Sequence, residues 1–88
     1  MSTSYERGAR VALQTFLGKT TAPEDCRPAN NYWLLLGATG TVIAPPNAER
    51  RVLVRWDVDV AGRGLACHNP EPNSLLIAES DLVVLRLD

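Results

Sequence analysis

The chain has 88 residues, a length that suits one domain and excludes a second. Nine Lys and Arg against ten Asp and Glu leave a net charge of −1, which excludes the strongly basic balance of a general nucleic-acid binder. No apolar run approaches the roughly 18–20 residues of a membrane span, and the first ten residues lack the apolar stretch of a secretory signal. We therefore expect one cytoplasmic domain over residues 1–88, with residues 1–6 flexible and no membrane contact.

The first half of the chain contains two predicted strands. Val11 and Leu13 alternate with more polar neighbours in residues 9–15, and alternation of this kind predicts a strand. Residues 40–44 are rich in β-branched side chains and predict a second strand. Two prolines and an asparagine in residues 45–48 then predict a hairpin turn.

The clearest pattern lies in residues 51–60. An apolar side chain occupies every second position over ten residues: Val52, Val54, Trp56, Val58 and Val60. A half-buried strand produces this period, whereas a helix would scatter these residues over both of its sides. We predict one long strand that bends or turns near Asp59, followed by a glycine-rich turn at residues 61–64.

The remaining segments are shorter or irregular. Residues 65–67 are short and could pair as a further, fourth strand. Residues 74–78 and 81–87 are predicted as the closing strands, and residues 79–81 as one turn of 3₁₀ helix. Residues 17–37 carry two prolines and no sustained period, so they are predicted to form a long loop. The fold class predicted is all-β: a five-stranded barrel with a long loop after the first strand and a short 3₁₀ turn before the last.

The order of residues resembles that of Src-homology-3-like (SH3-like) barrels. The likeness is carried by Tyr32-Trp33, Gly40-Thr41-Val42, the segment 52–57 and Ser80-Asp81-Leu82. Among such barrels these segments are similar to KOW-type modules and photosystem I subunit IV. Two further segments, 22–26 and 67–70, resemble small uncharacterised bacterial proteins. The resemblance implies a fold and no site residues, because one fold hosts many functions.

Metal and thiol chemistry have little support in the residue spacing. Cys67 and His68 are adjacent and Cys26 is remote, so the Cys-x-x-Cys and paired-histidine spacings of zinc sites are absent. Adjacent strand residues point to opposite faces, which separates a Cys67 thiol from a His68 imidazole. We expect no cofactor, no metal and no enzymatic activity, and we keep a metal- or thiol-dependent protein as a further alternative.

Nucleic-acid binding is the first alternative. Residues 50–63 hold four arginines against two aspartates, a local excess that is typical either of RNA phosphate contacts or of a solvated strand face. Nucleic-acid sites usually add clustered charge and exposed aromatic rings. We therefore favour the solvated face and retain an RNA- or DNA-contacting KOW-like barrel as the alternative.

Aromatic rings beside amides suggest a peptide site instead. Such residues offer flat apolar area together with orienting hydrogen bonds. We predict a shallow groove between the long loop and the later connections, lined by Asn30, Asn31, Tyr32, Trp33, His68, Asn69 and Asn73. The competing interpretation is that these side chains only fix the loop to the barrel. The leading hypothesis is a non-enzymatic protein-interaction module, or a small subunit of a protein assembly, whose partner is another protein or a peptide.

Overall fold

The computed structural model describes residues 5–67 and 71–85. These residues contain five strands: β1 (Arg10–Leu13), β2 (Thr39–Ala44), β3 (Arg51–Trp56), β4 (Ser74–Ala78) and β5 (Leu82–Val84). Four short 3₁₀ helices lie between them: η1 (Pro28–Asn30), η2 (Tyr32–Leu35), η3 (Ala61–Arg63) and η4 (Glu79–Asp81). The described residues form no α-helix, so the all-β prediction is confirmed.

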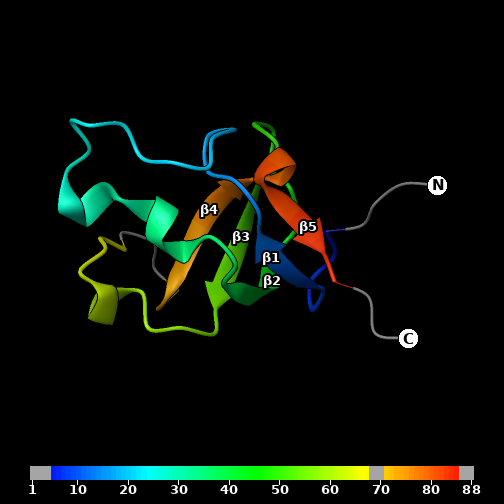
Figure 1. Ribbon diagram of the computed structural model, residues 1–88. Helices are drawn as coiled ribbons and strands as arrows, with labels where there is room; N and C mark the ends of the chain where they lie inside the picture. Colours follow the sequence, from blue (N-terminus) through cyan, green and yellow to red (C-terminus); the bar gives the residue numbers. More distant parts are fainter. Residues whose placement is uncertain (1–4, 68–70, 86–88) are drawn as a thin grey trace.

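The strands form one antiparallel sheet in the order β4-β3-β2-β1-β5. The predicted hairpin between β2 and β3, the long loop after β1 and the 3₁₀ turn before β5 are all present. In the described residues β4 and β5 do not pair with each other, and the sheet therefore stays open instead of closing into the predicted barrel. Figure 1 shows the sheet on one side of the molecule and the long β1–β2 loop extending on the other.

The core follows from the alternation in β3. Val52, Val54 and Trp56 point inward and are buried, whereas Arg51 and Arg55 of the same strand are exposed. The other buried apolar side chains come from every strand and from the loops: Val11, Leu13, Leu35, Val42, Val60, Leu65, Leu75, Ile77 and Leu82. Gly40 leaves room for this packing, because a Cβ there would lie 2.7 Å from the Arg55 carbonyl oxygen and 3.1 Å from the Trp56 ring.

The strand predicted over residues 51–60 ends at Trp56, four residues early. The cause is Asn73, whose side-chain amide donates to the carbonyls of Trp56 (2.8 Å) and Val58 (2.7 Å) and whose oxygen accepts from the Val60 amide (2.7 Å). These bonds pair the backbone polar groups of a turn, and this turn returns Val60 to the core. Asparagine suits this position because its backbone is left-handed here, at φ 60°.

The predicted strand at residues 65–67 is also wrong. Leu65 is buried in the core, but the Ala66 amide donates to the Ala29 carbonyl (2.9 Å) in the long loop and not to a sheet strand. At the chain ends the strands are shorter than predicted: β1 covers four residues of 9–15, and β5 begins at Leu82, because Asp81 belongs to η4, and ends at Val84. The last two residues of the predicted strand 81–87 lie outside the described residues. Tyr5, within the leader predicted to be flexible, donates to the Glu79 carbonyl (2.9 Å).

An ion pair crosses the outer face of the sheet. The Arg10 guanidinium binds both carboxylate oxygens of Asp57, and the Thr39 hydroxyl donates to the same carboxylate at 2.6 Å. These hydrogen bonds, from Arg10 first and Thr39 second, lower the pKa of Asp57 to about 2. Both charged side chains remain partly exposed, at 36% and 46%, so solvent screens the pair.

This pKa predicts acid sensitivity. The unfolded carboxyl has a pKa near 3.9, so the stabilisation is fully present above about pH 4 and is lost as the pH falls towards the folded value of about 2. Because the pair is screened, we expect it to contribute less than about 1 kcal/mol. Urea unfolding of wild type and Asp57→Asn at pH 7, 4 and 2.5 checks this: the two curves should converge at low pH. A difference that stays constant or grows on acidification would contradict it.

Candidate functional site

A tight hairpin at the start of the long loop places an exposed leucine at its tip. Phe16 and Lys19 exchange backbone hydrogen bonds of 2.9 and 3.0 Å. The two residues between them, Leu17 and Gly18, both have left-handed backbones, at φ 54° and 77°. Turns of this type favour Asn-Gly, because a side chain with a Cβ is strained in the left-handed region. Leu17 is nevertheless 62% exposed, so no burial of its own side chain offsets that strain.

The carboxylate of Asp81 holds this hairpin in place. Asp81 is 2% exposed and accepts hydrogen bonds from the Thr15 hydroxyl (2.6 Å) and from the amides of Leu17 and Gly18 (3.0 Å each). Its backbone carbonyl also accepts from the Gln14 amide (2.9 Å). A buried carboxylate is stable only when such donors surround it. The turn before β5 therefore fixes the geometry of a loop more than 60 residues away in the chain.

The 3₁₀ helix η2 brings two aromatic rings of the loop against the Phe16 ring of the hairpin. Trp33 packs edge-to-face on Phe16 with ring centroids 4.9 Å apart, and Tyr32 packs on the same ring at 5.4 Å. We call Phe16, Tyr32 and Trp33 the aromatic cluster. Each of the three side chains is only partly buried. The cluster thus joins the hairpin to η2 while keeping aromatic surface accessible.

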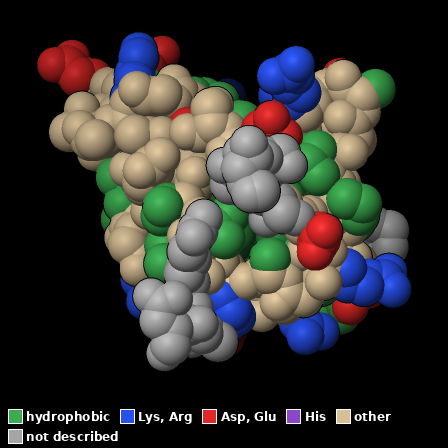
Figure 2. Space-filling model, turned by 90° about the vertical axis from the view of Figure 1, so that its right-hand side faces the viewer, with side chains coloured by type: hydrophobic (Ala, Val, Ile, Leu, Met, Phe, Trp, Pro, Cys, Tyr) green, Lys and Arg blue, Asp and Glu red, His purple; other side chains and the backbone are tan. Residues whose placement is uncertain are grey.

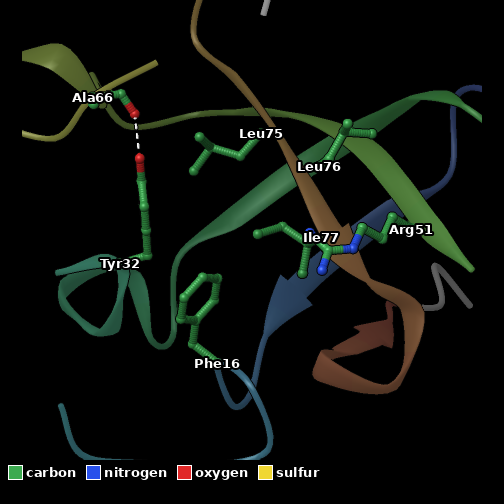
Figure 3. A pocket seen from close by; sticks show the side chains of 7 residues that line it. All are labelled: Phe16, Tyr32, Arg51, Ala66, Leu75, Leu76 and Ile77. Atoms are coloured by element: carbon green, nitrogen blue, oxygen red, sulfur yellow. Dashed lines mark hydrogen bonds between the residues drawn. The ribbon is translucent and has the colours of Figure 1, made fainter. Parts of the chain in front are cut away.

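Tyr32 also connects the cluster to the segment after η3. Its hydroxyl donates to the Ala66 carbonyl at 2.6 Å (Figure 3). Burial, and secondarily the nearby Cys67, raise the pKa of Tyr32 above its ordinary value of 10. The shift favours the protonated phenol, which is the form that donates this hydrogen bond.

Two hollows flank the aromatic cluster. The first, which we call the inner hollow, has a volume of about 240 Å³ and lies between Phe16 and Tyr32 on one side and β4 on the other. Figure 3 shows these two rings facing the side chains of Leu75 and Ile77 across it. The second, which we call the outer hollow, has a volume of about 420 Å³ and lies on the outer side of the cluster. Its lining includes Leu17, Asp25 and Arg27. Both hollows thus share Phe16 and Tyr32 as a common wall.

Two polar atoms near the cluster are buried without a hydrogen-bond partner among the described residues: Asn31 Oδ1 and Trp33 Nε1. Each such atom costs on the order of 1–3 kcal/mol.

The structure brings part of the predicted groove together. Tyr32 and Trp33 belong to the aromatic cluster, Asn30 lines the outer hollow, and Asn31 lies between η1 and η2. Asn73 has a different role, since its side chain is occupied by the turn after β3 and lines another depression beside Asp57 and Cys67. His68 and Asn69 lie outside the described residues.

Sequence reasoning missed Phe16 and Leu17, and it also missed the wall that β4 provides. The pair Phe16-Leu17 directly before Gly18 could have indicated an apolar turn after the first strand. The contribution of Arg51, Leu75 and Ile77 to the inner hollow has no local signal, because it depends on how the loop folds back over the sheet.

The thiols do not form a catalytic arrangement among the described residues. Cys26 and Cys67 are both free, and the Cys67 thiol donates to the Ser74 carbonyl. Within residues 5–67 and 71–85, no three His, Cys, Asp or Glu side chains gather as metal ligands do. Chemically, the described site offers apolar surface and hydrogen-bonding groups, which suits binding.

No protein-family model matches the chain, and no curated protein or solved structure is similar enough to count as a match. In the described part of the chain, no helix is both long and apolar enough to cross a membrane.

Proposed function

We propose that this protein is a non-enzymatic interaction domain that binds a protein or peptide partner at the aromatic cluster. The observation that carries the proposal is Leu17, a strained apolar residue presented to solvent beside the outer hollow. Strained backbones of this kind concentrate at functional sites, where the surrounding structure maintains them. Here the buried Asp81 carboxylate maintains the strain.

The neighbouring surface favours a protein ligand. Partly exposed aromatic rings next to hollows are typical of interface hot spots, where a few anchors contribute most of the binding energy. The outer hollow contains one acidic and one basic side chain, Asp25 and Arg27, so its charges balance. A nucleic-acid site would instead gather positive charge, and binding that is strongly salt-sensitive would favour that alternative.

We also propose that the fold is of the SH3-like kind and that the protein acts in the cytoplasm, either alone or as a small subunit of an assembly. The strand order, with β1 between β2 and β5 and a 3₁₀ turn joining β4 to β5, supports the fold. The resemblance in residues 52–57 and 80–82 supports it as well.

Replacing Leu17 by asparagine tests the function. Asparagine tolerates the left-handed backbone, so we expect Leu17→Asn to unfold at the same or a higher temperature, with a gain of up to about 1 kcal/mol. The variant loses the apolar anchor, and we expect about tenfold weaker binding of a peptide selected on wild type. The measurement is isothermal titration with a peptide taken from a displayed library of random twelve-residue sequences.

Leu34→Asn is the matched control. Leu34 is 52% exposed in η2 and lines neither hollow, so this variant should bind the peptide as wild type does. The proposal fails if Leu17→Asn retains full affinity, if both leucine variants lose affinity equally, or if the library contains no peptide that binds the wild-type protein.

A further inference from the structure

The strand β4 is an open edge of the sheet. It is the last strand in the order β4-β3-β2-β1-β5, so no described strand pairs with its outer side. Two hydrogen bonds set the direction of its backbone groups: the Trp56 amide donates to the Asn73 carbonyl, and the Glu79 amide donates to the Arg50 carbonyl (3.0 Å each). Since bonding alternates along an antiparallel ladder, the N–H and C=O groups of Leu76 and Ala78 point away from β3.

The described residues of β4 carry none of the usual sequence protections against pairing. Natural proteins guard edge strands with Lys, Pro, inward-pointing charge or a bulge. The sequence of β4 is Ser-Leu-Leu-Ile-Ala, with a regular register against β3 and no charged or proline residue. Leu76 is 41% exposed on its outer face. Among the described residues, the thiol of Cys67 covers the Ser74 end of the strand.

The inner hollow lies directly beside the open edge. Leu75 and Ile77 point into the molecule from β4, and the rings of Phe16 and Tyr32 face them (Figure 3). A strand added to β4 would place alternate side chains on the same face as Leu75 and Ile77. Those side chains would enter the hollow, whose volume of about 240 Å³ suits one or two apolar groups.

Charge complementarity further defines the occupant. Arg51 lines the same hollow, and it pairs in the ladder with Ala78, near the end of β4. No described acidic side chain forms an ion pair with Arg51. A carboxylate on the bound strand, near the end that lies beside Ala78, would find this guanidinium unpaired.

We propose that the partner binds as an extended strand on the open edge of β4, with an apolar side chain in the inner hollow and an acidic side chain beside Arg51. The inference rests on the proposed function and specifies how the partner is held. Main-chain hydrogen bonds to Leu76 and Ala78 provide affinity, and the hollow and Arg51 provide specificity, as in other complexes formed by strand addition.

The opposite edge supplies a control. β5 has only three residues, and the side of the molecule that carries it shows hydrophobic and charged side chains interspersed (Figure 2). The Leu85 amide donates to the Arg10 carbonyl (2.8 Å), so the Val84 N–H points outward from this edge, as the Leu76 N–H does from β4. Proline at either position removes an outward N–H without breaking a ladder hydrogen bond.

The experiment compares Leu76→Pro with Val84→Pro, using the library-selected peptide as the probe. We expect at least tenfold weaker binding for Leu76→Pro and unchanged binding for Val84→Pro. Arg51→Gln should weaken binding about three- to tenfold and reduce its salt dependence. Peptides N-methylated at single positions should lose binding at every second residue, because only alternate N–H groups face β4; this readout does not depend on the folding of any variant.

The outcomes separate this inference from the proposed function. Binding that depends on Leu17 but tolerates Leu76→Pro, with no alternating effect of N-methylation, would leave the function standing and overturn strand addition. A wild-type dimer in sedimentation that Leu76→Pro dissociates, without peptide binding, would mean that two copies pair through β4 and would also overturn it. Absence of any selected peptide would overturn both.

Discussion

Replacing Asp81 by alanine should destabilise the domain by about 3–5 kcal/mol. The carboxylate accepts three hydrogen bonds in a buried position, and its loss leaves the Thr15 hydroxyl and the Leu17 and Gly18 amides without their acceptor. Bonds to a charged group contribute roughly 1.5–3 kcal/mol each, and stranded donors add a desolvation cost. In a domain of this size 1 kcal/mol shifts the melting temperature by about 4–8 °C, so a fall of at least about 12 °C is expected in thermal unfolding.

Two further variants locate the effect. Asp81→Asn keeps the volume and one acceptor oxygen, so its loss of stability should be intermediate. Ser80→Ala changes an exposed side chain in the same 3₁₀ turn and should be almost neutral. If Asp81→Ala melted within a few degrees of wild type, the hairpin would not depend on this carboxylate.

Val54→Asp should unfold the domain. Val54 is fully buried in the centre of β3, between cross-strand neighbours on β2 and β4. A carboxylate there has no described donor side chain to pair with. An unpaired buried charge costs more free energy than a small domain can lose, because total free energies of unfolding are only about 5–15 kcal/mol. Circular dichroism at 25 °C should show an unfolded chain.

Arg55→Asp provides the matched control on the same strand. Arg55 is exposed on the opposite face, so this variant should remain folded. If Val54→Asp were folded, or Arg55→Asp unfolded, the buried and exposed faces of β3 would be the reverse of those described.

The face of β3 was predictable because alternation is a local property of the sequence. Its end at Trp56 was not, since that end depends on the side chain of Asn73, which is distant in the chain. The same reasoning explains the failed strand at residues 65–67, whose backbone bonds to Ala29 in the long loop and not to the sheet.

The site was predictable to a similar extent. The run Asn30 to Trp33 indicated two aromatic anchors, and both belong to the cluster that Phe16 completes. The pair Phe16-Leu17 before Gly18 could have indicated an apolar turn, but the strained backbone of Leu17 could not be foreseen, because it requires the Asp81 carboxylate from the far end of the chain. The open β4 edge is likewise a product of strand order, which periodicity alone does not specify.

The central claim is that the aromatic cluster binds a partner, and an NMR titration tests it most directly. Amide and indole resonances of the ¹⁵N-labelled protein would be followed as the library-selected peptide is added. We predict that the largest shifts fall on residues 16–19, on Tyr32 and on the Trp33 indole N–H, with Leu76 also affected. The Trp56 indole, which is buried in the core, should move little. Shifts confined to the outer face of β3, around Arg55 and Asp57, with the Trp33 indole unmoved, would contradict the account.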